Sequence, residues 1–105
     1  MEKPNLSYIE ELSGGDNAFK EKLIAIVKKE LPREISDYKT NIEAASYEKA
    51  AENVHKLKHK ISILGLEEAY YMAMDYEEDL RNERLECQSK FEAILLQMSQ
   101  FIELL

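Results

Sequence analysis

Between residues 46 and 65 the sequence carries a seam of apolar residues at helical spacing. An α-helix turns about 100° per residue, so side chains spaced alternately three and four positions apart lie on one side of it. Six apolar residues have this spacing: Tyr47, Ala50, Val54, Leu57, Ile61 and Leu64. Ser46 is a favourable N-cap, and Gly65 suits the left-handed position that ends many helices. The segment therefore predicts an amphipathic helix whose seam faces a core.

A longer stretch with the same spacing follows Asp16, which is a good N-cap residue. Its apolar positions continue to about residue 45: Phe19, Leu23, Ile26, Val27, Leu31, Ile35, Tyr38 and Ile42. Pro32 lies inside this pattern. Proline lacks a backbone N–H and disfavours helical geometry at the preceding residue, so we expect a kink or a brief break there. Two shorter helices are the alternative.

Three further stretches complete the pattern. A short helix capped by Asn5 or Ser7 is expected before Gly14, and a last helix from about residue 87. A further helix, with two glutamates in its first turn, is expected after Gly65, and residues 82–86 connect it to the last helix. Its seam consists of Leu66, Ala69, Tyr70, Ala73, Tyr76, Glu77 and Leu80. The predicted fold is all-α: an antiparallel up-down four-helix bundle with a short additional N-terminal helix, formed by residues 1–105 as a single domain.

The composition agrees with this fold and limits the partners. Hydrophobic residues make up 45% of the chain, whereas glycine and proline total only 3 and 2, which leaves little turn material for a sheet protein. A net charge of −7 argues against nucleic acid or an anionic membrane as the main partner. Cys87 is the only cysteine, so no intramolecular disulfide can form. Without a signal-peptide pattern or a long apolar run, we expect a cytoplasmic monomer.

A second stripe of side chains lies about 120° round the 46–65 helix from its apolar seam. It contains His55, Lys58, His59 and Ser62, which should be partly supported by neighbours and still reach water. Three lysines on the opposite flank predict a solvated face: Lys49, Lys56 and Lys60. Other side chains are expected in the core or at the rim of the bundle: Tyr70, Tyr71, Met72, Met74, Tyr76 and Cys87.

The stripe also carries a motif. His55-x-Leu57-Lys58, with Gly65 ten residues after the histidine, resembles the motif of histidine-containing phosphotransfer (HPt) domains, in which His-x-Leu-Lys-Gly is followed by a small residue and a Gly. Residues 8–19, the Leu31-Pro32 pair and the acidic-apolar helix after Gly65 extend the resemblance over almost the whole chain. One position departs from the family: His59 stands where a glycine commonly follows the lysine.

The resemblance implies a phosphoprotein of two-component signal transduction. In a phosphorelay, His55 would accept a phosphoryl group from a receiver-domain phospho-aspartate and pass it to another receiver aspartate, and Lys58 would stabilise the group. Histidine suits this role because its ordinary pKa near 6.5 leaves a substantial neutral, nucleophilic fraction. The implied partner is the receiver domain of a response regulator or hybrid histidine kinase. That partner would bring Mg²⁺, so this chain needs no cofactor and acts as a phosphocarrier rather than a stand-alone enzyme.

His59 has three interpretations, since a residue four positions after His55 lies almost directly above or below it. Its imidazole could swing aside and be tolerated, could hydrogen-bond to His55 or to the phosphoryl group and tune it, or could obstruct transfer. Ser62 is small and could keep the site open.

Other classes of function fit the sequence less well. The His55–His59 spacing places two imidazoles on one side of a helix, as in metal sites, but two ligands are too few. Glu52 and His55 supply one Glu-x-x-His motif without the second copy that di-metal bundles use. No set of nucleophile, base and acid, or glycine-rich phosphate loop, indicates a hydrolase or transferase. The runner-up is therefore a helical module that binds receiver or kinase domains without relaying phosphate.

Overall fold

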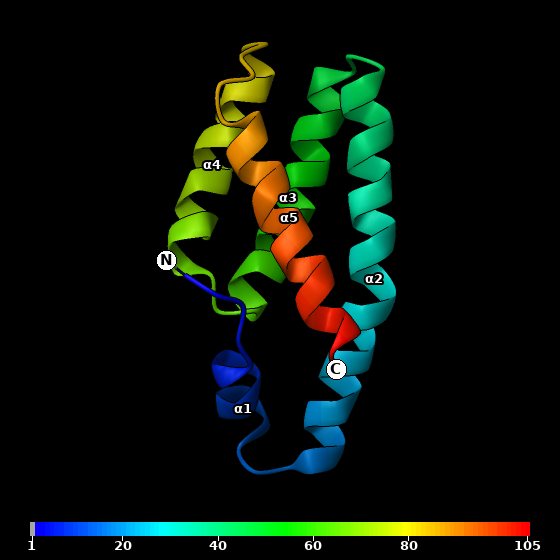
Figure 1. Cartoon of the computed structure of the whole chain (residues 1–105), viewed down its shortest axis with the longest axis vertical. Coiled ribbons are helices and arrows are strands. Elements are labelled where there is room, and N and C mark those ends of the chain that lie inside the picture. Colours follow the sequence, from blue (N-terminus) through cyan, green and yellow to red (C-terminus); the bar gives the residue numbers. More distant parts are fainter. Residues whose placement is uncertain (1) are drawn as a thin grey trace.

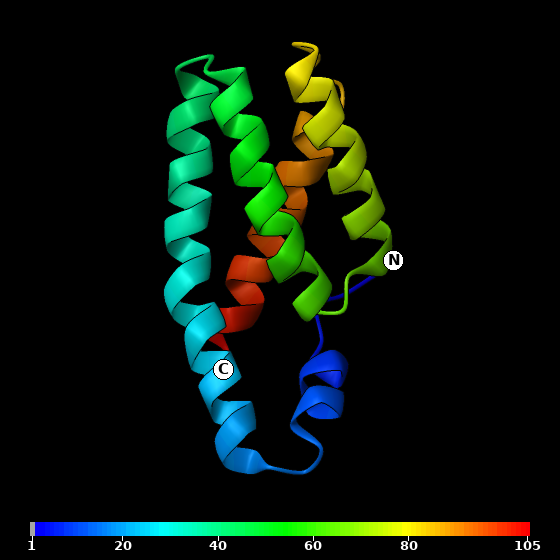
Figure 2. The same ribbon diagram turned by 180° about the vertical axis from the view of Figure 1, so that it is seen from behind.

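The computed structural model describes residues 2–105, and Met1, the first residue of the predicted domain, lies outside this range. The described part is all-helical, with five helices: α1 (Ser7–Ser13), α2 (Asn17–Glu43), α3 (Tyr47–Ile63), α4 (Glu67–Arg81) and α5 (Gln88–Glu103). Helices α2 to α5 alternate in direction (Figures 1 and 2), which confirms the predicted up-down bundle. The short α1 lies beside the N-terminal turns of α2, beyond the α3–α4 connection, so it covers one end as expected.

Some of the predicted signals set helix ends, and others do not. Asp16 caps α2, since its Oδ1 accepts a hydrogen bond from the Phe19 N–H at 3.1 Å. Ser46 stands at the N-cap of α3, but its side chain makes no capping hydrogen bond. Gly65 has a φ of 77°, and the α3 terminus around it is closed by two backbone hydrogen bonds, from Leu66 N–H to Ile61 at 3.1 Å and from Gly65 N–H to Ser62 at 3.0 Å. This is a Schellman termination.

α2 runs through Pro32 without a break, so a brief break and the alternative of two shorter helices are wrong, and a kink is the part of the prediction that stays compatible with one continuous helix. Pro32 is exposed, whereas Leu31 and Ile35 on either side of it are buried in the core. Because Pro32 removes a hydrogen bond only on the water-facing side, the lost carbonyl partner can be replaced by solvent. Packing of the two flanking apolar side chains keeps the helix continuous.

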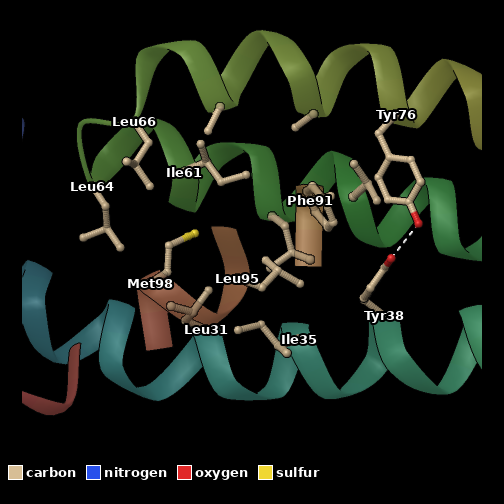
Figure 3. Packing of buried hydrophobic residues seen from close by; sticks show 14 of the residues in the cluster. Leu31, Ile35, Tyr38, Ile61, Leu64, Leu66, Tyr76, Phe91, Leu95 and Met98 are labelled. Atoms are coloured by element: carbon tan, nitrogen blue, oxygen red, sulfur yellow. Dashed lines mark hydrogen bonds between the residues drawn. The ribbon is translucent and has the colours of Figure 1, made fainter. Parts of the chain in front are cut away.

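Most of the core comes from the predicted seams (Figure 3), but Phe19 and Ile26 near the start of the predicted α2 seam are exposed. Five of the six seam residues of α3 are completely buried: Ala50, Val54, Leu57, Ile61 and Leu64. One polar pair crosses this core, because the Tyr38 and Tyr76 hydroxyl oxygens lie 2.6 Å apart and Tyr38 also donates to Glu92 Oε2 at 2.9 Å. Burial is the main cause that raises the pKa of Tyr76 to about 12, and burial also raises the pKa of Tyr38, so both hydroxyl groups stay neutral at physiological pH.

The prediction of a solvated lysine face on α3 is wrong at Lys60. This lysine is buried rather than solvated, and its Nζ lies 3.0 Å from Glu30 Oε1 and 3.2 Å from Glu34 Oε2 on α2. The α2–α3 packing brings two glutamates against this flank, which spacing within α3 alone cannot reveal. Lys49 and Lys56 are exposed, as predicted.

The start of α4 has a capping group that the sequence did not suggest. Its N-terminal turn contains the expected glutamates, but the backbone N–H groups of Glu68 and Ala69 donate to the Glu2 carboxylate at 2.7 and 3.0 Å. On the same helix Tyr76 is buried, whereas Tyr71 and Met74 are exposed at the rim of the bundle. No described helix is long and apolar enough to cross a membrane.

Candidate functional site

The second stripe of α3 lies on the flank that faces α4. His55 reaches water, with 54% of its side chain exposed, and His59 and Ser62 are also exposed. Lys58 differs from them, because only 11% of its side chain is accessible. The structure therefore brings the four predicted residues to one side of α3 but shields Lys58 against Glu77 of α4.

Glu77 of α4 joins two members of the stripe. Its Oε1 lies 3.4 Å from His55 Nδ1 and 3.0 Å from Lys58 Nζ, while its Oε2 lies 3.3 Å from Arg81 Nη2. Arg81 also pairs with Glu48 on α3. Partial burial by itself raises the pKa of Glu77, but the hydrogen bond and charge of Lys58, together with Arg81 and His55, hold this pKa below its usual value. Glu77 is thus a carboxylate at neutral pH.

The contact with Glu77 has a chemical consequence for His55. An ionised carboxylate can only accept hydrogen bonds, so its contact with Nδ1 favours the imidazole form that carries a proton on Nδ1. In the neutral ring this leaves the lone pair on Nε2. The arrangement therefore presents an exposed imidazole whose Nε2 can act as a nucleophile, with a negative charge behind the ring that stabilises positive charge on it.

Lys58 is held from two sides. Besides its 3.0 Å contact with Glu77, its Nζ lies 5.8 Å from the centre of the Tyr70 ring. The ammonium group thus sits next to the same carboxylate as the His55 ring. This places a cation beside the acceptor histidine predicted from sequence, in a position that side chains of α4 fix.

His59 contacts the His55 ring directly. The two ring centres lie 5.3 Å apart with an interplanar angle of 73°, an edge-to-face arrangement. His55 remains about half exposed beside this neighbour, so His59 does not cover it. Ser62 lies two turns further along α3, where it lines an open hollow of about 680 Å³ with residues of the N-terminal segment, α1 and α4.

Glu77 is the site residue that sequence reasoning did not assign. The pattern placed it among the apolar seam positions of the helix after Gly65, and a charged residue within a seam is a signal of a paired group. Its partner could not be named from spacing, because His55 and Lys58 lie on another helix. Within the described residues, no group of three or more histidine, cysteine, aspartate or glutamate side chains is arranged to hold a metal ion.

Fold and site together define a class of protein: a small helical bundle that displays one oriented histidine on its surface rather than in a pocket. Comparison with known families makes the assignment specific. The sequence model of the Hpt domain family matches residues 22–104, and the chain belongs to this family. The matched region spans most of α2 and all of α3, α4 and α5, and leaves out α1. No curated protein and no solved structure matched the chain.

Proposed function

We propose that this protein is a histidine phosphotransfer module that relays a phosphoryl group between receiver domains through Nε2 of His55. The observation that carries the proposal is the contact of His55 Nδ1 with Glu77 on a ring that is 54% exposed. One ring nitrogen is held by the protein, and the other is left for a partner. Membership of the Hpt domain family supports the same chemistry.

The transfer step needs few groups from this chain. The Nε2 lone pair attacks the phosphorus of a receiver phospho-aspartate, an N–P bond forms, and the P–O bond to the aspartate breaks with its electron pair leaving on the carboxylate. The Nδ1 proton stays on the ring, next to Glu77, whose charge offsets the positive charge that develops on the imidazole. The reverse sequence on a second receiver returns His55 to its initial state.

Lys58 would stabilise the transferred group. A phosphoryl group on His55 carries up to two negative charges and strong acceptor oxygens, so it competes with Glu77 for the Lys58 ammonium. Sharing this cation neutralises part of the spread charge without any metal from this chain. Mg²⁺ would belong to the receiver partner, and the protein would act as a monomeric cytoplasmic carrier.

The test is phosphoryl transfer from a phosphorylated receiver domain with Mg²⁺ to the wild type, His55→Gln and Lys58→Gln, followed by intact mass. We expect one phosphoryl group on the wild type, none on His55→Gln and slower acceptance by Lys58→Gln. Phosphate on His55→Gln would contradict the assignment of the acceptor.

The second candidate function, binding of receiver or kinase domains without transfer, is favoured by one observation. His59 replaces the family's usual glycine and touches the His55 ring. If the wild type accepts no phosphate while His59→Gly does, His59 blocks the site and the binding-only function replaces the relay.

A further inference from the structure

We propose that His59 is a second phosphoryl-binding side chain of this site, which supplies a cation to a phosphoryl group carried on His55. The proposal rests on the proposed function of His55. It assigns a role to the residue at which this chain departs from the family motif.

The first argument is the charge around His55. Lys58 and Arg81 are the cations that contact Glu77, and both are engaged with that carboxylate, while Arg81 also binds Glu48. The two positive charges of Lys58 and Arg81 therefore equal the two negative charges of Glu77 and Glu48. A phosphoryl group adds up to two negative charges to a cluster whose positive charges already have partners, so a further cation close to Nε2 would be stabilising.

The second argument is geometric. The centre of the His59 ring is 5.3 Å from that of His55, and both side chains point to solvent. A phosphoryl group on Nε2 would extend beyond the His55 ring by the N–P and P–O bonds, and at this ring spacing the His59 imidazole is a candidate partner for its oxygens. Among the described residues the His59 imidazole has no hydrogen-bond or ion-pair partner. It is therefore available for a new one.

The third argument concerns the charges that His59 would experience. On α3 the charged residues within two turns of His59 are Glu52, Lys56, Lys58 and Lys60. On α4, Glu77 contacts the neighbouring His55 ring and holds Arg81 on its other carboxylate oxygen. From α1, Glu11 lines the hollow beside Ser62. A phosphoryl group next to His59 adds negative charge to this set and favours the protonated imidazole, so the group and the imidazolium stabilise each other.

The experiment measures the second ionisation of the phosphoryl group by ³¹P NMR as a function of pH. The wild type, His59→Gln and His59→Lys are phosphorylated on His55 with phosphoramidate, which needs no receiver. A nearby cation favours the dianion, so the midpoint should be lowest in His59→Lys, intermediate in the wild type and highest in His59→Gln. A difference of about half a pH unit is expected for one charge at this exposed distance.

Lys49→Gln is the matched control, because it removes an exposed cation from the same helix almost three turns away from His59. Its midpoint should equal that of the wild type. Equal midpoints in all His59 variants, with His55 phosphorylated in each, would overturn this inference and leave the relay intact. Absence of phosphate on His55 in the wild type would overturn both.

Discussion

The two flanks of α3 carry similar ion pairs with different surroundings. On the α4 side, Lys58 Nζ lies 3.0 Å from Glu77, and on the α2 side, Lys60 Nζ lies 3.0 Å from Glu30. The lysine side chains are almost equally shielded, at 11% and 9% exposed. The two pairs differ in what else the carboxylates contact. Glu77 also contacts the His55 ring, whereas within the described residues the only ion-pair partner of Glu30 and Glu34 is Lys60 itself.

This comparison shows that a shielded ion pair between helices does not by itself mark a site. Both pairs fix α3 against a neighbouring helix, and such pairs add little net stability once desolvation is included. In the proposed relay the α4-side pair would have a chemical role, because its carboxylate also contacts the ring of the proposed acceptor, His55. The α2-side pair has no such third partner, and we infer that its role is structural.

The largest expected effect is the loss of phosphoryl acceptance when the proposed acceptor, His55, is replaced. His55→Gln should abolish phosphoryl acceptance, while the free energy of unfolding changes by less than about 0.5 kcal/mol, because the side chain is half exposed. Transfer assays and urea unfolding measure the two quantities. Loss of both phosphoryl acceptance and stability in this variant would indicate that His55 is a packing residue.

Replacing a residue of the apolar seam between the two flanks should lower stability without removing phosphoryl acceptance. Leu57 is completely buried, so Leu57→Ala should lower the free energy of unfolding by about 2 to 5 kcal/mol. The folded fraction should still accept phosphate, as measured in the same two assays. Loss of acceptance at full stability would contradict this division of roles.

The two lysines test the comparison directly. Lys60→Met should lower the free energy of unfolding by about 1 to 3 kcal/mol, because it leaves the partly buried carboxylate of Glu34 without its cation, and Glu34 Oε1 already has no hydrogen-bond partner. Transfer by the folded protein should not slow. Lys58→Met should slow transfer. Equal slowing in both variants would remove the distinction between the flanks.

The smallest expected effect is the pH dependence due to Glu77. The pKa of Glu77 is lowered in the folded state, so its contribution to stability is complete above the ordinary value of 4.5 and is lost as pH falls through the folded-state pKa. The difference in unfolding free energy between wild type and Glu77→Gln should therefore be constant near neutral pH and shrink in acid. When both proteins also carry Lys58→Met, this difference in unfolding free energy should change less with pH. An unchanged pH profile in that background would show that Lys58 does not cause the lowered pKa of Glu77.

Spacing along the chain predicted most of the fold, because burial of an apolar seam is a property of each helix taken alone. The seams of α2 and α3, the Asp16 cap and the Gly65 termination follow from such local signals. The absence of a break at Pro32 could not be predicted from the sequence, because it depends on the packing of Leu31 and Ile35, which outweighs the loss of one solvent-facing hydrogen bond.

The site was predicted less completely. Spacing placed His55 and Lys58 on one stripe, but it could not identify Glu77 as their partner or Glu30 and Glu34 as the partners of Lys60. Those contacts depend on how α3 is rotated against α4 and α2. The Glu2 cap of α4 likewise joins residues far apart in the sequence.

The most direct test of the central claim is to identify the phosphorylated nitrogen in ¹⁵N-histidine-labelled protein by ³¹P–¹⁵N and ¹H–¹⁵N NMR after transfer from a receiver. We predict an N–P bond at Nε2 of His55, with the proton retained on Nδ1 beside Glu77. Phosphate on Nδ1 of His55, on His59, or on no histidine at all would contradict the account.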